Sequence, residues 1–423
     1  MKILITNVYS YKNKGDAAIV VSLIKEIRRA FGNDAEILAQ TADIKHDDGK
    51  YDVPVTQSLL WTLLSRVRDD NIVKRLYVPI KGILSLSLYL FCVNAFHKEF
   101  RFLLNRDMKQ FVDENKQADL VIACGGGYLR TAHGSLRETI LLFVTCLNFL
   151  TAKYLGKQVY LYSQSIGPVH GGLQEKMLKF TLNRVDIVQP REDVSVAYLQ
   201  KLGIKAKVVP TADAALLLGG TGVFPERVAT LDKQKMHVGL TVRKWFKDTA
   251  QLEAYETAVA QNIDYLIEKH NAQVFYIPQV IAENFGDDDR IVAKEVWDKV
   301  KNKDLFTVVD ADLHPFEVIG LCGAMDIFIG TRMHSNIFSL ISKVPVVAIE
   351  YEHKTRGIMR GLGLEDLTID IKDVTPQTLQ QRIDLLLNNK DAYRTLLINN
   401  LPGQVAEGQK AINSIKAAYE GTI

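Results

Sequence analysis

The sequence contains few cysteines, and their arrangement excludes a disulfide framework or a cysteine-based metal site. The 423 residues include four of them: Cys92, Cys124, Cys146 and Cys322. None has CxxC spacing, and each lies in an apolar run where a thiol packs as a small hydrophobic group. The N-terminal segment MKILITNVYS also lacks the long apolar core and the cleavage site of a signal peptide. We therefore expect a cytoplasmic protein.

A large excess of one charge is also absent. Lys and Arg number 52 against 49 Asp and Glu, which gives a net charge of +3. This is too little to form the basic surface of a nucleic-acid-binding protein, so no nucleic-acid partner is expected. With 47% hydrophobic and 24% charged residues, the composition is that of a folded globular protein. The length indicates two domains or one large domain.

The longest hydrophobic run covers residues 80–96 and holds one charged residue, Lys81. Its length is at the short limit of the ~17 to 25 residues that cross a bilayer. Nine Lys and Arg lie between residues 66 and 109, against four acidic residues. Two interpretations stay open: a core helix with a solvated basic flank, or a peripheral contact with the inner face of an anionic membrane.

Elsewhere, short apolar runs alternate with longer amphipathic ones, which is typical of βα units and parallel sheets in an α/β fold. The predicted strands cover residues 2–6, 119–124, 158–163, 186–189, 206–210, 236–242, 273–278, 305–309, 326–330 and 344–350. The predicted helices include residues 16–31, 135–155, 250–269, 287–301, 314–323, 333–342 and 375–388.

These elements predict two Rossmann-like halves. We expect an N-terminal domain at 1–216, a linker at 217–235, a C-terminal domain at 236–390 and a helical segment at 391–423. A helical, partly apolar insertion at about 57–112 interrupts the first domain. Ligands of open parallel sheets bind beyond the carboxyl ends of the strands, so the natural site is a cleft between the two sheets. Functional residues are therefore expected directly after strands.

Glycine and polar residues follow the first predicted strands. Asn13, Gly15 and Asp16 precede a helix, where glycine lets backbone N–H groups approach an anion or a sugar and Asp16 is a candidate cap. Three successive glycines, including Gly126 and Gly127, imply close approach of a ligand or of a neighbouring loop. The GxGxxG spacing of a dinucleotide fold is missing, so NAD is not expected.

The later strands of the first half also end in polar residues. Gln164 and Ser165 suit hydroxyl recognition or turn formation equally well. Arg191 stands beside two acidic residues, which favours a structural ion pair over a ligand contact. Asp213 completes the set and is equally suited to capping a helix.

Cations follow the strands of the second half: Arg243 after one, Arg332 with His334 after another, and Lys354 after a third. A helix N-terminus that carries Arg and His attracts anions. Because each buried cation would otherwise need its own carboxylate, the set indicates a shared phosphate or carboxylate ligand. Residues 287–289, three successive aspartates, lack ligand spacing and are interpreted as a helix N-terminus on the surface, so no metal is expected.

Six motifs in order resemble the polysaccharide pyruvyl transferase family: NxGDxA from residue 13, GGGYL (125–129), QSIGP (164–168), RExxS (191–195), RxHS (332–335) and PVVAIEYEHK (345–354). The resemblance covers about residues 1–365. It implies two facing Rossmann-type domains similar to the GT-B architecture of glycosyltransferases. It also implies transfer of the pyruvyl group of phosphoenolpyruvate onto two sugar hydroxyls as a cyclic ketal, with no cofactor beyond this co-substrate. The insertion at 57–112 matches no motif.

The resemblance further implies the roles of single residues. His334 is expected beside the reacting carbon as a general acid, and Asp16 is a candidate to position or deprotonate the acceptor hydroxyl. The expected donor-binding residues are Arg243, Arg332, Ser335 and Lys354. The expected acceptor-binding residues are Asn13, Gly15, Gly126, Gly127, Gln164 and Ser165. The acceptor would be a sugar of a cell-surface polysaccharide or of its lipid-linked precursor.

Two other classes of function fit the same residues. A GT-B glycosyltransferase would use the cations to hold the diphosphate of a nucleotide-sugar, and thermal shift with phosphoenolpyruvate against UDP and GDP separates the two enzymes. A non-catalytic, membrane-associated scaffold of envelope biosynthesis would have no need for the set of cations.

Overall fold

The computed structural model describes residues 1–64, 72–282 and 287–421, and the chain forms two compact units. Unit 1 contains Met1–Tyr11, Ile19–Ala214 and Glu407–Ile423, and unit 2 contains Lys12–Ala18 and Ala215–Ala406. The domain boundary predicted at residue 216 is close to Ala214, where the main segment of unit 1 ends. The sequence analysis did not foresee that a short N-terminal segment joins unit 2 and that the C-terminal segment returns to unit 1. The expected linker at 217–235 is part of unit 2.

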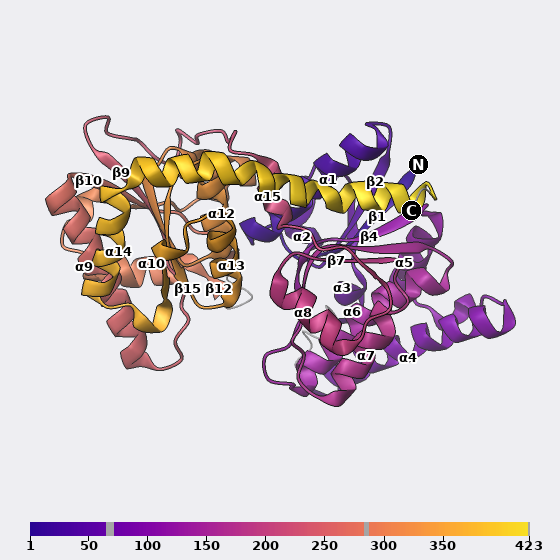
Figure 1. Cartoon of the computed structure of the whole chain (residues 1–423). Coiled ribbons are helices and arrows are strands. Elements are labelled where there is room, and N and C mark those ends of the chain that lie inside the picture. Colours follow the sequence, from indigo (N-terminus) through magenta and orange to yellow (C-terminus); the bar gives the residue numbers. More distant parts are fainter. Residues whose placement is uncertain (65–71, 283–286, 422–423) are drawn as a thin grey trace. The chain divides into compact units, whose positions relative to one another are not determined.

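Unit 1 is built on a parallel sheet with the strand order β3-β2-β1-β4-β6-β7-β8, and β5 pairs with β6. The strands are β1 (Lys2–Val8), β2 (Glu36–Thr41), β3 (Val55–Gln57), β4 (Leu120–Ala123), β5 (Gly126–Leu129), β6 (Gln158–Ile166), β7 (Ile187–Pro190) and β8 (Lys207–Val208). The central strands are buried apolar runs, as expected of a sheet covered on both faces. In Figure 1, α1 lies on one side of this sheet and α6 on the other.

The helices of this part of the chain are α1 (Lys14–Phe31), α2 (Ile44–Asp47), α3 (Leu59–Leu64), α4 (Ile72–Phe96), α5 (Arg106–Gln117), α6 (Leu136–Tyr154), α7 (Gly172–Leu182) and α8 (Asp193–Leu202). A capping box between Ser135 and Glu138 begins α6. In the described part of the expected helical excursion between β3 and β4, the α-helices are α3, α4 and α5. Residues 66–71 of its predicted basic flank lie outside the described part of the chain.

Unit 2 contains a second parallel sheet with the order β13-β10-β9-β14-β15-β16 and a two-stranded ribbon, β11-β12. Its strands are β9 (Met236–Thr241), β10 (Ala272–Tyr276), β11 (Ile281–Ala282), β12 (Asp287–Asp288), β13 (Phe306–Val308), β14 (Ile327–Gly330), β15 (Val346–Glu350) and β16 (Thr368–Asp370). Every second-half strand expected from the sequence is present within one or two residues.

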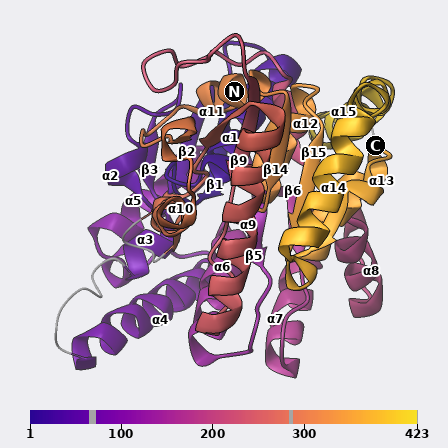
Figure 2. The ribbon, with the colours of Figure 1, turned by 90° about the vertical axis from the view of Figure 1, so that its left-hand side faces the viewer.

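The helices of unit 2 are α9 (Thr249–His270), α10 (Asp289–Lys299), α11 (Pro315–Gly323), α12 (Met333–Ile341), α13 (His353–Gly361), α14 (Pro376–Asn388) and most of α15 (Lys390–Tyr419). Figure 2 shows α9 and α14 side by side in front of the sheet. Helix α12 follows strand β14 directly, and helix α13 follows strand β15. The first residues of α12 and α13 therefore lie at the carboxyl edge of this sheet.

Candidate active site

The predicted cations of the second half follow three neighbouring strands. β14 pairs with β9 on one side and with β15 on the other, and all three strands are parallel. In this register Gly330 lies opposite both Thr241 and Ala348. Arg243, Arg332 and Lys354 therefore enter the same edge of one sheet from consecutive strands, as the sequence analysis expected.

Arg332 is held by a buried carboxylate that the sequence analysis did not identify. Its Nε and Nη2 atoms lie 3.0 and 2.5 Å from Oδ1 of Asp289, whose side chain is 1% exposed. The other carboxylate oxygen of Asp289 accepts hydrogen bonds from the backbone N–H groups of Gln279 and Val280 at 2.9 and 3.0 Å. Burial raises the pKa of Asp289, and the charge of Arg332 opposes this shift. The argument that Arg332 needs an external anion is thus weaker than the sequence suggested.

The triple aspartate at 287–289 is correctly predicted as a helix N-terminus, but its placement on the surface is wrong. Asp288 caps α10 by accepting from the backbone N–H of Arg290 at 2.9 Å. Asp288 and Asp289 are both buried, and ion pairs with Arg290 and Arg332 compensate the cost of burying their carboxylates. The cluster therefore serves to hold two arginines.

Ser335 fixes the turn between β14 and α12. Its hydroxyl donates to the carbonyl of Arg332 at 2.7 Å and lies 2.8 Å from Oγ1 of Thr241. Thr241 in turn accepts from the backbone N–H of Thr331 at 3.2 Å. Because Ser335 is fully buried and engaged with protein groups, its position suits support of Arg332 and His334 better than direct contact with a donor.

The first turn of α1 lies against His334. The backbone N–H of Lys14 donates to the carbonyl of Gln279 at 2.8 Å, and the buried ammonium of Lys14 pairs with Asp312. These contacts place Gly15 so that an added Cβ would lie 2.1 Å from Nδ1 of His334. Gly15 is thus required by the imidazole of His334, within unit 2 itself.

Asn13 immediately precedes α1 (Lys14–Phe31) and caps its first turn. The side-chain oxygen of Asn13 accepts from the backbone N–H groups of Gly15 and Asp16 at 3.1 and 3.3 Å. Asp16, the candidate cap in the sequence analysis, is the third residue of the helix and therefore does not occupy the N-cap position. Asp16 is half-buried and follows Gly15 directly, so it lies in the helical turn that contacts His334.

Arg243 lies in an aromatic setting that the sequence analysis missed. Its guanidinium carbon is 4.5 Å from the ring centroid of Tyr351 and 5.6 Å from that of Trp245, and the two rings are 4.7 Å apart. Such contacts hold a guanidinium in place without neutralising its charge. Lys354 lies in the first turn of α13, after β15, and its Nζ is 3.9 Å from a carboxylate oxygen of Glu352. The sequence feature that could have indicated this setting is Trp245, two positions after Arg243.

The glycine run of unit 1 has a structural explanation at its first member. An added Cβ at Gly125 would lie 2.6 Å from the carbonyl oxygen of Ser163, so the close approach is that of strand β6. At Gly126 the nearest atoms belong to the ring of Tyr128, at 3.0 Å. Gly127 is exposed.

Gln164 and Ser165 face the interior of unit 1. The amide nitrogen of Gln164 donates to the carbonyl of Cys124 at 2.6 Å. The hydroxyl of Ser165 accepts from Nε of Arg191 at 2.9 Å, and Arg191 also pairs with Asp213 at 2.9 Å. The prediction of a structural ion pair at Arg191 is confirmed. Both Gln164 and Ser165 are buried, so turn and network formation explain them better than hydroxyl recognition.

A second polar cluster of unit 1 follows β1 and β2 and was not expected. The carboxylate of Asp47 accepts from the backbone N–H of Tyr11 at 2.8 Å and from the hydroxyl of Thr41. Asp43 accepts from Ser10 and contacts Nδ1 of His46, each at 2.8 Å. Burial raises the pKa of Asp47 to about 6. The cluster anchors the loop that leads from β1 towards Lys12.

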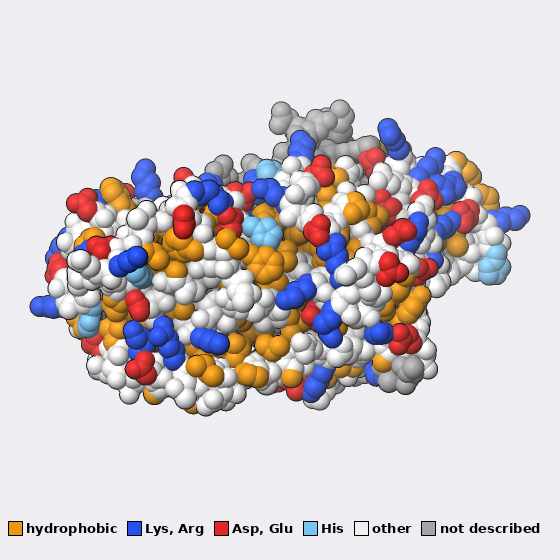
Figure 3. Space-filling view, turned by 90° about the horizontal axis from the view of Figure 1, so that it is seen from above, with side chains coloured by type: hydrophobic (Ala, Val, Ile, Leu, Met, Phe, Trp, Pro, Cys, Tyr) orange, Lys and Arg blue, Asp and Glu red, His pale blue; other side chains and the backbone are white. Residues whose placement is uncertain are grey.

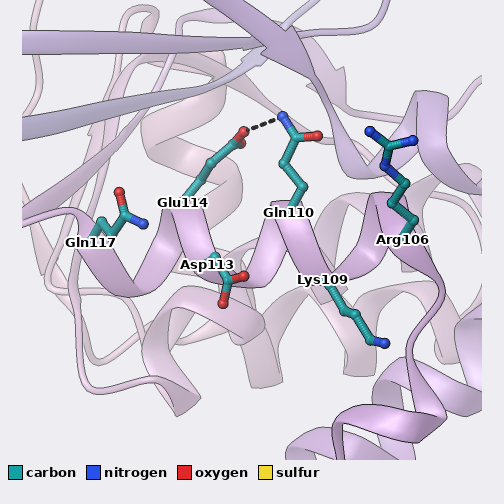
Figure 4. A pocket seen from close by; sticks show the side chains of 6 residues that line it. All are labelled: Arg106, Lys109, Gln110, Asp113, Glu114 and Gln117. Carbon is teal, nitrogen blue, oxygen red and sulfur yellow. Dashed lines mark hydrogen bonds between the residues drawn. The ribbon is translucent and has the colours of Figure 1, made fainter.

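Two surface hollows of about 470 Å³ each lie away from these residues. One is formed by a single face of α5, where Gln110 hydrogen-bonds Glu114 between Arg106 and Gln117 (Figure 4). The other lies beside the first residues of β1 and β2, at the edge opposite to the carboxyl ends. Among the residues that the structure describes, no group of three or more His, Cys, Asp or Glu is placed to hold a metal ion.

Comparison with known proteins agrees with this architecture. Among solved structures, the chain is similar to UDP-GlcNAc 2-epimerase from Neisseria meningitidis bound to UDP-GlcNAc (TM-score 0.59, 12% identity, 98% of this chain and 99% of that one). It is also similar to Anabaena HepE in complex with UDP-glucose (TM-score 0.54, 15% identity, 100% of both chains). These likenesses establish the GT-B-like fold expected from the sequence.

In sequence, the chain is 28% identical over 418 residues to the amylovoran biosynthesis protein AmsJ of Erwinia amylovora, covering 92% of both. The family model for polysaccharide pyruvyl transferase matches residues 13–353, which include every donor-site residue except Lys354. The chain therefore belongs to the polysaccharide pyruvyl transferase family.

Proposed function

We propose that the protein transfers the pyruvyl group of phosphoenolpyruvate onto two hydroxyls of a sugar, forming a cyclic ketal and releasing phosphate. The observation that carries the proposal is the arrangement of Arg243, Arg332 and Lys354 after three consecutive strands, with His334 in the first turn of α12. Phosphoenolpyruvate carries a phosphate and a carboxylate, and guanidinium groups bind both in bidentate geometry. Membership of the family supports the same reaction class.

The first chemical step needs a proton at the methylene carbon of the donor. In the proposed mechanism His334 gives this proton as a general acid, which leaves an oxocarbenium-like centre at C2. A sugar hydroxyl attacks C2 and loses its proton, and the product is a tetrahedral phospho-ketal. Asp16, which follows Gly15 in the turn against His334, is the candidate to accept or orient that hydroxyl proton.

The second step breaks the bond between C2 and the phosphate oxygen. Phosphate leaves with the electron pair, and a second hydroxyl of the same sugar attacks C2 and loses its proton, which closes the ring. Arg243 and Lys354 are the proposed contacts for the leaving phosphate, because fixed cations stabilise charge that develops in the transition state. Arg332, which is held in place by Asp289, is the proposed contact for the donor carboxylate.

The acceptor side is assigned to the turn at Asn13–Asp16, where Asp16 follows Gly15 beside His334. Gln164 and Ser165 are assigned a supporting role, because both are buried. We place the reaction in the cytoplasm, where phosphoenolpyruvate is made, and at the inner face of the membrane where the acceptor is a lipid-linked precursor of a surface polysaccharide.

The direct test is incubation of the full chain with phosphoenolpyruvate and a panel of free and lipid-linked glycosides. Phosphate release that depends on one acceptor, together with a pyruvyl mass gain on that acceptor, is the expected result. The His334→Gln variant should bind the donor but turn over about 10² to 10⁴ times more slowly. Stabilisation by UDP or GDP but not by phosphoenolpyruvate in thermal shift would instead favour a nucleotide-sugar glycosyltransferase.

A further inference from the structure

Helix α4 exposes an apolar stripe on one side while its other side is buried in unit 1. Leu86, Tyr89 and Leu90 are at most 3% exposed and pack with residues of α3, α5 and α6. On the outer side, five large hydrophobic side chains are between 48% and 63% exposed: Tyr77, Ile80, Leu84, Leu88 and Phe91. Their spacing of three and four residues puts all five on one face of the helix. We call this set the α4 stripe.

Two more exposed aromatic residues lie at the end of α4 and shortly after it. Phe96 and Phe102 are 58% and 79% exposed, and the ring of Phe96 meets that of Phe91 edge-on at 5.9 Å. Single exposed hydrophobic residues are ordinary, whereas a contiguous row of this kind marks an interaction surface.

The charge around the stripe identifies the kind of partner. Residues 77–109 contain five Lys and Arg against two acidic residues, so this short segment alone carries a net charge of +3, equal to that of the whole chain. Lys81 stands over the ring of Tyr77 at 5.8 Å, and Lys98 follows the helix end. Figure 3 shows Lys and Arg side chains among hydrophobic ones at the right-hand end, where α4 projects in Figure 1.

We propose that the α4 stripe docks on the surface of an anionic lipid bilayer, with the helix axis along the membrane plane. An apolar row with aromatic and Lys residues at its rim is the surface that interfacial helices present to acyl chains and headgroups. A second copy of the chain would bring a like-charged basic rim against this one.

Residues Tyr77–Phe96 are long and apolar enough to cross a membrane, yet the burial of the inner face argues against spanning. A spanning helix would have to withdraw Leu86, Tyr89 and Leu90 from the core of unit 1. The stripe itself extends over about 21 Å, less than the ~30 Å hydrocarbon core. In this proposal the inner face of α4 packs in the core of unit 1 and the outer face contacts the lipid surface.

Flotation of the purified full chain with vesicles tests the proposal without reference to the reaction. The wild type should bind phosphatidylserine-containing vesicles, bind neutral phosphatidylcholine vesicles far less, and lose binding as salt is raised. Leu84→Glu and Phe91→Glu should each lower binding about tenfold or more. Leu173→Glu is the matched control, because Leu173 lies on α7 of the same unit and is 65% exposed against 63% for Leu84. It should bind as the wild type does.

Three results would overturn the proposal: no vesicle binding by the wild type, equal loss in Leu173→Glu, or salt-independent binding that survives both glutamate variants. A wild-type dimer in sedimentation that Leu84→Glu converts to a monomer, without vesicle binding, would assign the stripe to a second copy instead. If the glutamate variants fail to fold by circular dichroism, the pair Leu84→Ser and Leu88→Ser and the charge reversal Lys81→Glu with Lys98→Glu give the same readout. Each should weaken binding to anionic vesicles.

Discussion

The Cα of Gly15 and the imidazole of His334 are in contact, although 319 positions separate them in the sequence. An added Cβ at Gly15 would lie 2.1 Å from Nδ1 and 2.4 Å from Cγ of His334. Neither the ring nor the helical backbone of α1 has room for another side chain at this position. The glycine of the first motif is therefore explained by the histidine of the fifth.

The Gly15→Ala substitution should displace His334 and impair the chemical step. We expect turnover to fall on the order of 10²-fold, as when a general acid is misplaced, with a smaller change in donor affinity. Steady-state kinetics and calorimetry with phosphoenolpyruvate separate these two effects. Gly403→Ala is the control, because no atom lies within 4 Å of a Cβ at that helical position. Full activity in Gly15→Ala would show that the contact does not matter for the reaction.

The ion pair between Asp289 and Arg332 should stabilise unit 2 as well as orient the arginine. Asp289→Asn leaves a buried guanidinium without its counter-charge, which typically costs about 3 to 5 kcal/mol. Asp310→Asn removes an exposed partner of Arg290 and should change the free energy of unfolding by less than about 1 kcal/mol. Denaturant unfolding measures both variants. A double variant with Arg332→Ala that is no less stable than either single variant would confirm the coupling, and additive losses would contradict it.

Arg243 should bind the donor, with Tyr351 as its support. Arg243→Gln removes one charge-assisted contact and should weaken donor affinity by about 1.5 to 3 kcal/mol. Tyr351→Ala removes the ring that lies 4.5 Å from the guanidinium and should produce a smaller loss in the same direction. Tyr351→Phe keeps the ring and should retain affinity. Calorimetric titration that gives equal dissociation constants for the wild type and Arg243→Gln would remove Arg243 from the donor site.

The fold could be predicted because its main signals are local. The run at 326–330 appears as β14 and the run at 344–350 as β15, each bounded by turn residues and followed by a helix. Apolar runs of this length specify buried strands whatever their partners are. The positions of the cations followed from the same signals, since a residue after a parallel strand lies at the carboxyl edge.

The contacts that define the site could not be predicted in this way, because they join distant parts of the chain. Nothing in the sequence near Arg332 indicates that Asp289 is its partner. Lys12–Ala18 likewise belong to unit 2, and Asn13 forms a β-bridge with Val280. A single bridge of this kind leaves no periodic pattern in the sequence. The side chain of Gln164 is buried against Cys124 and that of Ser165 against Arg191. A motif at a strand end does not distinguish a buried from an exposed side chain.

The stability of unit 1 should depend on the protonation of Asp47. Burial, the main cause, raises its pKa from 3.8 to about 6, while the hydrogen bonds from Thr41 and Tyr11 oppose this rise. Between these two values the folded protein holds a proton that the unfolded chain has lost, so stability falls as the pH rises. Well below pH 3.8 both states are protonated, and well above pH 6 the full cost is present, which is about 3 kcal/mol.

The Asp47→Asn variant isolates this effect, because every other titrating group is common to it and the wild type. Asparagine keeps an oxygen that accepts from the backbone N–H of Tyr11, whereas it carries no charge at any pH. The stability of the wild type relative to Asp47→Asn should therefore decrease by about 2 kcal/mol between pH 4 and pH 7, with the change centred near pH 5. Urea unfolding at a series of pH values measures this difference. Parallel pH profiles for the two proteins would contradict the prediction, because they would mean that Asp47 has the same pKa in the folded and the unfolded chain.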